Sequence, residues 1–207
     1  MLTIQEVKEA LSYGVSEANA QYIKWSGGLS VQDHGVENLM SSWMAKSLFD
    51  LGSKKDSQCY VTLETSFREI AEGAGQKGPG RWPSRLNGRC DVVYYDRNGN
   101  ATGLIEIKRW FGYSRQKNDI DRLTTMMEKC SSIKWSAVAA IRQRWQTTRD
   151  EASATLDKFI ESAESDFGNF RFLSFHKFSE NDSSTYDDPA FLGYDALGAV
   201  IHRRKAE

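Results

Sequence analysis

The segment from Arg89 to Lys108 constrains the fold of this 207-residue chain most, because it has the pattern of two β-strands joined by a tight turn. Asn98-Gly99 lies between two apolar stretches and favours a two-residue type I′ turn, which needs a positive φ at both positions. With that turn, Asp91 lies directly opposite Glu106, with Cβ atoms roughly 5 Å apart on one face of the sheet. Lys108 is two residues beyond Glu106 and therefore points to the same face. The hairpin thus predicts two carboxylates and an ammonium group at one place.

Helical patterns precede the hairpin. A capping box at Thr3–Glu6 predicts a helix over residues 3–21, with an interruption at Gly14. Apolar residues at helical spacing predict a second helix over residues 35–51. Glu37 lies in its first turn, where it either complements the helix dipole or reaches toward the hairpin.

A strand, a short helix and a glycine-rich loop connect these helices to the hairpin, over residues 59–63, 66–72 and 73–89. The loop contains four basic residues and no acidic residue. Two interpretations stay open: a solvated flexible loop, or a loop that contacts phosphate groups beside Asp91. The basic residues are Lys77, Arg81, Arg85 and Arg89.

Five further elements follow the hairpin in the order helix, strand, helix, strand, strand. Their predicted bounds are 118–131 (capped by Asn118 or Asp119), 133–141, 150–165, 169–178 and an edge strand at 196–202. This alternation predicts parallel crossover packing next to the antiparallel hairpin. We therefore expect one α/β domain over residues 1–207, in which helices flank a mixed sheet with the hairpin at its centre.

The composition excludes several classes of protein. The 27 basic residues nearly balance the 28 acidic ones, so a nucleic acid would have to bind a local basic surface. Three widely spaced cysteines favour free thiols in a reducing compartment over a disulfide framework or a zinc site. We expect a cytoplasmic protein, because the sequence has neither the pattern of a secretory signal nor an apolar run that could cross a membrane.

The residues of the hairpin suit a metal-dependent hydrolase. Mg²⁺ prefers oxygen ligands and commonly uses one or two carboxylates together with water and substrate phosphate, so we expect Asp91 and Glu106 to bind it. The backbone carbonyl of Ile107 is a further candidate ligand. Lys108 has two candidate roles: it either orients the attacking water or stabilises charge in the transition state. A role as proton acceptor would require a strongly lowered pKa.

The spacing of Asp91, Glu106 and Lys108 resembles the motif of the PD-(D/E)XK nuclease superfamily, which has the restriction-endonuclease-like fold. The resemblance covers about half of the chain, residues 35–141, where the expected elements follow the family order α-β-β-β-α-β. It implies cleavage of phosphodiester bonds with Mg²⁺ or, in substitution, Mn²⁺, and it implies that Glu37 joins the site. The family's proline before the aspartate is Cys90 here, which weakens the match of the motif.

The resemblance predicts a DNA endonuclease of the restriction, phage, mobile-element or defence type. Besides the basic loop, Arg109 and Arg115 are candidate nucleic-acid contacts, and the aromatic residues between them fit either base stacking or the core. Cutting both strands with one site per chain favours a two-fold homodimer. Three alternatives stay open: a surface ion pair between Glu106 and Lys108, a catalytically inactive module that binds nucleic acid or protein, and a hydrolase for a small phosphorylated substrate.

Overall fold

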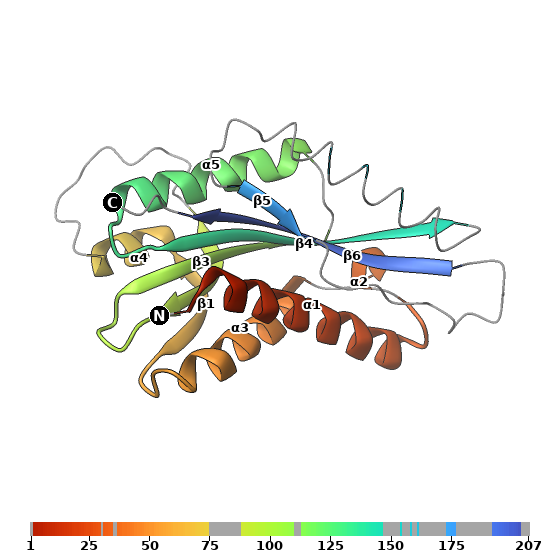
Figure 1. Cartoon of the computed structure of the whole chain (residues 1–207), viewed down its shortest axis with the longest axis horizontal. Coiled ribbons are helices and arrows are strands. Elements are labelled where there is room, and N and C mark those ends of the chain that lie inside the picture. Colours follow the sequence, from red (N-terminus) through yellow and green to blue (C-terminus); the bar gives the residue numbers. More distant parts are fainter. Residues whose placement is uncertain are drawn as a thin grey trace.

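The computed structural model describes residues 2–29, 31–34, 37–74, 88–109, 113–146, 173–176 and 192–203, with three isolated helical positions at 154, 158 and 161. Six described strands form one mixed sheet in the order β1-β2-β3-β4-β6-β5, and helices cover both of its faces (Figure 1). The strands are β1 (Tyr60–Ser66), β2 (Arg89–Tyr95), β3 (Ala101–Lys108), β4 (Trp135–Gln146), β5 (Leu173–His176) and β6 (Leu192–Arg203). The helices are α1 (Ile4–Ser26), α2 (Val31–His34), α3 (Glu37–Ser53), α4 (Phe67–Gly73) and α5 (Tyr113–Lys129).

The predicted α/β class and mixed sheet are confirmed. The elements α3, β1, β2, β3, α5 and β4 follow one another in the order expected of a restriction-endonuclease-like core, apart from the short α4 between β1 and β2. β2 and β3 are antiparallel, whereas β3 and β4 are parallel and are connected through α5. The sheet therefore combines a hairpin with a crossover, as the alternation of patterns predicts.

The hairpin has the predicted register at its open end but a different turn. The last pair of the ladder is Val92 and Ile105, which lies directly next to the predicted pair of Asp91 and Glu106 in the same register. At the turn, the Gly99 N–H donates to the carbonyl of Asp96, and Gly99 has a φ of +77°. Asn98 does not adopt a positive φ, so the type I′ prediction is wrong. The loop instead has three residues and ends in a left-handed glycine, a common hairpin geometry.

A β-bulge restores the predicted register. Tyr95 pairs with Ala101, but Tyr94 pairs with Gly103, so Thr102 has no partner residue in β2. The Thr102 hydroxyl donates to the carbonyl of Tyr94 at 3.4 Å, which satisfies this buried side chain locally. The extra residue offsets the longer turn, and the pairing from Tyr94 outward is the one that a two-residue turn would give.

Helix α1 begins at the predicted capping box but continues without interruption through Gly14 to Ser26. Gly14 instead marks a close approach of two helices. A Cβ atom at this position would lie 2.7 Å from the Cα atom of Met44 in α3. The glycine therefore lets α1 and α3 pack tightly, and the predicted break is wrong.

Two other predicted boundaries are corrected after the hairpin. Helix α5 begins at Tyr113, so Asp119 lies inside the helix and is not its cap. Strand β6 is internal to the sheet and pairs with both β4 and β5, because the four-residue β5 takes the edge position. Only positions 154, 158 and 161 of the predicted helix at 150–165 are described, and all three are helical.

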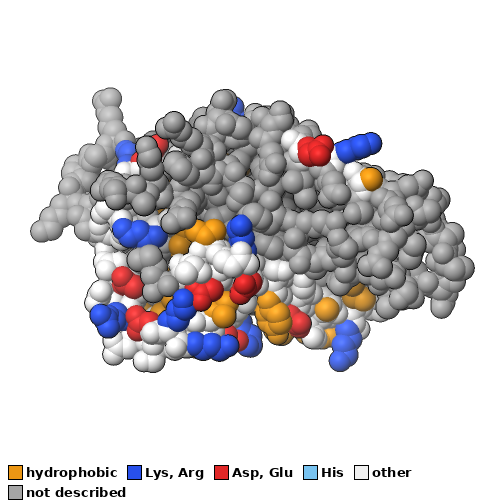
Figure 2. Space-filling model, in the orientation of Figure 1, with side chains coloured by type: hydrophobic (Ala, Val, Ile, Leu, Met, Phe, Trp, Pro, Cys, Tyr) orange, Lys and Arg blue, Asp and Glu red, His pale blue; other side chains and the backbone are white. Residues whose placement is uncertain are grey.

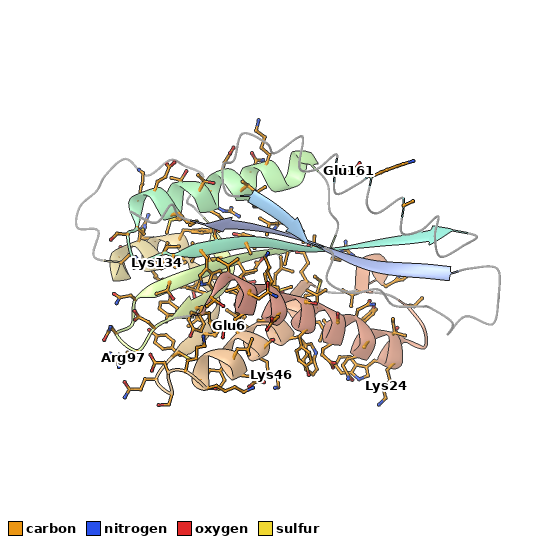
Figure 3. All side chains as sticks on the ribbon, in the orientation of Figure 1. Glu6, Lys24, Lys46, Arg97, Lys134 and Glu161 are labelled. Atoms are coloured by element: carbon orange, nitrogen blue, oxygen red, sulfur yellow. The ribbon has the colours of Figure 1, made fainter. Side chains whose placement is uncertain are left out.

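Two apolar clusters form the core, one on each face of the sheet. The first packs α1 and α3 against Val92, Ile105 and Trp135. The second packs α4 and α5 against Val93 and Leu104. In Figure 3 the side chains fill the space between the sheet and α1 and α3, while the exposed Lys24 and Lys46 extend away from it.

The three cysteines are free, as the sequence predicts, and all three are buried. In the part of the chain that the structure describes, no helix is long and apolar enough to cross a membrane.

Candidate active site

The open end of the β2–β3 hairpin, opposite the turn that contains Arg97 (labelled in Figure 3), brings the predicted site residues together. Asp91 lies in β2, and Glu106 and Lys108 lie near the end of β3. The side chain of Glu106 is only 2% exposed, whereas that of Lys108 is 26% exposed. A buried carboxylate therefore lies below an ammonium group that reaches solvent.

Asp91 uses one oxygen to extend the strand pairing. Its Oδ2 atom accepts a hydrogen bond of 2.5 Å from the backbone N–H of Ile107, just beyond the last pair of the ladder, Val92 and Ile105. Burial raises the pKa of Asp91, while the Ile107 N–H opposes this rise. In an antiparallel strand the N–H and C=O of one residue face the same neighbour, so the Ile107 carbonyl also faces the Asp91 side.

Glu106 uses both of its oxygens. Oε1 lies 2.8 Å from the guanidinium of Arg122, and Oε2 lies 3.4 Å from the Lys108 ammonium. Burial and then the charge of Asp91 raise the pKa of Glu106 to about 7, although Arg122 and Lys108 oppose the rise. This carboxyl group therefore changes its charge near neutral pH.

Lys108 lies between two carboxylates, because its Nζ atom is also 3.5 Å from Oδ2 of Asp119. Burial lowers the pKa of Lys108, but the charges of Glu106, Asp119, Asp91 and Glu37 outweigh burial and raise it above its ordinary value. The lysine is thus a hydrogen-bond donor at neutral pH. A proton acceptor would need a lowered pKa, which this surrounding does not provide.

Glu37 lies beside the site but has a partner of its own. It is the first residue of α3, and its Oε1 atom accepts a hydrogen bond of 3.0 Å from the backbone N–H of Arg109. Its charge contributes to raising the pKa of Asp91 and of Lys108. Glu37 therefore connects α3 to the residue directly after β3.

The predicted nucleic-acid contacts are only partly described. Arg89 is exposed at the start of β2, and Arg109 is half-buried next to Lys108, so these two residues flank the site. The backbone of Arg115 lies in α5, but its side chain is outside the described residues, as are Lys77, Arg81 and Arg85. On the face shown in Figure 2, acidic and basic side chains of the described residues are intermixed.

Sequence reasoning missed Arg122 as a residue of the site and assigned Asp119 only to a helix cap. The Arg122 guanidinium lies 2.6 Å from Oδ1 of Asp119 and 4.9 Å from the ring centroid of Phe67. Both residues border the buried stripe that contains Ile120 and Leu123. Charged residues at the edge of an apolar helical stripe are the sequence signal that could have revealed them.

The residues of the site supply only a small number of oxygen ligands for a hard divalent cation. Asp91, Glu106 and the Ile107 carbonyl supply oxygen ligands, and Mg²⁺ often takes no more than one or two carboxylates from the protein. Among the described residues, no three Asp, Glu, His or Cys side chains lie close enough to hold a metal ion. Water and substrate oxygens would therefore complete the coordination shell.

Comparison with known proteins adds little to this geometry. No protein-family model matches the chain, and no curated protein matches it. One chain of the solved structure titled "cryoEM structure DrdV-DNA complex" is similar with a TM-score of 0.37 and 16% sequence identity. The match covers 76% of this chain and 96% of that chain. With such a low TM-score, it has no weight in assigning a function.

Proposed function

We propose that this chain is a Mg²⁺-dependent nuclease that hydrolyses phosphodiester bonds, specifically a DNA endonuclease of the restriction, phage, mobile-element or defence type. The observation that supports this most is the buried Glu106, which lies between the Lys108 ammonium and the Arg122 guanidinium beside Asp91. Strand ends rarely bury a carboxylate among charges without a chemical use for it, since buried ion pairs contribute little to stability.

Asp91, Glu106 and the Ile107 carbonyl hold the ion in this proposal. Bound there, Mg²⁺ would polarise the phosphodiester and lower the pKa of a water molecule. Asp91 keeps the bond from the Ile107 N–H through Oδ2, which leaves Oδ1 for binding. The proximity of a cation favours the ionised form of Glu106, whose pKa burial otherwise raises to about 7.

Lys108 acts as a charged donor to the phosphate oxygens, where negative charge accumulates in the transition state. Its raised pKa supports this role over that of a proton acceptor. Arg89 and Arg109 contact the neighbouring phosphates of the DNA, and the basic residues of segment 77–85 extend this contact. Affinity for DNA therefore falls steeply as the salt concentration rises.

The test is cleavage of plasmid and single-stranded DNA with Mg²⁺ or Mn²⁺ by wild type, Asp91→Asn and Lys108→Met. We expect each substitution to reduce the rate at least about 100-fold. Lys134→Met is the matched control, because the ammonium group of this exposed lysine donates to the carbonyl of Ser131 and not to a residue of the site. Equal cleavage by wild type and both site variants would contradict the assignment.

A catalytically inactive module is the second candidate, and the internal pairing of Glu106 favours it. Both oxygens of this carboxylate already have partners, and the described residues form no three-residue metal cluster. Calorimetry with Mn²⁺ separates the two candidates. A nuclease binds the ion in wild type and loses binding in Glu106→Gln, whereas an inactive module gives no heat with either protein.

A further inference from the structure

Helix α5 contributes two charged residues to the site that the proposed chemistry does not use. Asp119 and Arg122 lie on the side of α5 that faces the sheet, where their side chains are 10% and 19% exposed. Burying charged groups is unfavourable unless good partners compensate for the lost hydration. The position of these two charged residues between α5 and the sheet therefore suggests a role in the site.

The two residues complete a closed ring of four charges with β3. A single nitrogen of Arg122 lies 2.8 Å from Oε1 of Glu106 and 2.6 Å from Oδ1 of Asp119. Lys108 lies on the other side, 3.4 Å from Oε2 of Glu106 and 3.5 Å from Oδ2 of Asp119. Each carboxylate thus gives one oxygen to Arg122 and its other oxygen to Lys108.

Arg122 is held from a third element as well. Its guanidinium lies over the ring of Phe67 at the start of α4. The Phe67 N–H donates to the carbonyl of Gly88 at 3.1 Å, directly before β2. Arg122 is therefore fixed by groups outside β3, which is what a residue that orients Glu106 requires.

We propose that Arg122 and Asp119 are positioning residues of the nuclease site, a role that rests on the proposed function. Arg122 fixes Glu106 through Oε1 and leaves Oε2 for the cation. When Oε2 turns to the cation, Lys108 loses its bond to Glu106 but keeps Asp119. The two residues therefore have separate effects: Arg122 determines the affinity for metal, and Asp119 determines the placement of the ammonium group.

This separation is measurable with Mn²⁺ as the probe. By calorimetry, Arg122→Met weakens Mn²⁺ binding about 10- to 100-fold, the usual effect of removing a group that orients a ligand. Asp119→Asn leaves Mn²⁺ affinity close to that of wild type but lowers the cleavage rate at saturating Mn²⁺ about tenfold. Binding is thus measured independently of activity.

Two further variants keep the test informative if Arg122→Met folds poorly. Because one nitrogen of Arg122 makes both contacts, Arg122→Lys supplies the same charge to both carboxylates and recovers most of the Mn²⁺ affinity. Glu72→Gln removes the same charge at an exposed position of α4 and leaves both affinity and rate unchanged. Thermal unfolding in EDTA confirms that each variant is folded.

The outcomes distinguish this inference from the proposed function. If wild type binds Mn²⁺ and cleaves DNA, but Arg122→Met and Asp119→Asn behave like wild type, the positioning role is wrong and the nuclease proposal stands. Equal losses of affinity and rate in both variants also overturn it, since they indicate general loosening of the site. If wild type neither binds Mn²⁺ nor cleaves DNA, both proposals fail.

Discussion

The two faces of the central sheet are built from different chemistry. On the face covered by α1 and α3, the buried cluster is apolar and tightly packed, with Trp135 lying across Gly103. On the face covered by α4 and α5, the apolar cluster borders Glu106 and Asp119, which are almost as buried as the hydrophobic residues. Apolar burial stabilises a fold directly, whereas paired buried charges contribute little. The first face thus stabilises the fold, whereas the second face keeps buried charges that add little to the stability of the fold.

The largest effect should follow from filling space on the apolar face. A Cβ atom at Gly103 would lie 2.1 Å from the ring of Trp135, which is only 1% exposed. We expect Gly103→Val to lower the free energy of unfolding by about 3 kcal/mol or more, at the upper end of overpacking effects. Urea unfolding followed by Trp fluorescence measures this change. A loss below about 1 kcal/mol would mean that this face repacks easily.

The next effect concerns the charged face and depends on pH. Glu106 has a pKa of about 7 in the folded protein against an ordinary value of 4.5. The unfolded chain therefore loses this proton first, so the contribution to stability is complete below pH 4.5 and is lost as the pH rises through 7. At about 1.4 kcal/mol per pKa unit, the loss is about 3 kcal/mol.

Glu106→Gln stays neutral and should not show that loss. We expect the stability of wild type relative to Glu106→Gln to fall by about 3 kcal/mol between about pH 4 and pH 9, measured by urea unfolding in EDTA. Taking the difference between the two proteins removes the contribution of other titrating groups. A difference that does not change with pH would show that Glu106 ionises normally.

A smaller effect is expected where the helices of the apolar face meet. Gly14→Ala places a methyl group 2.7 Å from the Met44 backbone, while it gains helix propensity. We expect a net loss of about 1–2 kcal/mol in the free energy of unfolding. Cleavage per folded molecule should not change, because the described contacts of Asp91, Glu106 and Lys108 are made with β3 and with α5, not with α1. An unchanged or raised melting temperature would argue against the close approach.

The smallest effect should come from the hairpin turn, which both faces share. Oδ1 of Asp96 accepts hydrogen bonds from the backbone N–H groups of Asn98 and Asn100. Removing them in Asp96→Ala should cost about 1 kcal/mol, since the turn is exposed to water. Thermal unfolding measures the change, and Arg97→Ala in the same turn is the control. A large loss of activity would indicate that the turn influences the distant site.

Sequence patterns were sufficient to predict the hairpin, because the alternation of apolar residues and the choice of turn residues act locally. Val93 and Leu104 face one apolar cluster while Val92 and Ile105 face the other, so the hairpin is buried on both faces. The turn type was wrong because Asn98-Gly99 fits more than one geometry, and the pattern does not show that Asp96 binds two N–H groups.

The α5 part of the site could not be derived from local patterns. Arg122 meets Glu106 only because the crossover lays α5 over β3, and 16 residues separate the two along the chain. Asp119 fits the pattern of a helix cap equally well until the helix is known to begin at Tyr113. The order of the strands could not be derived from local patterns either, since nothing in segment 173–176 indicates that it lies at the edge of the sheet beside β6.

The bulge at Thr102 has a consequence for how this hairpin tolerates changes in length. Side chains alternate between faces along paired strands, so Glu106 and Lys108 face α5 only while Tyr94 stays opposite Gly103 and the pairing beyond it keeps its register. At this chain length the three-residue turn alone would shift that register by one residue, and the unpaired Thr102 corrects the shift. Loss of Thr102 itself would leave Tyr95 opposite Ala101 and Tyr94 opposite Gly103, so it would remove the bulge and keep Glu106 on its face of the sheet. In this hairpin, a change of one residue at the bulge is therefore expected to be absorbed locally, without a change at the site.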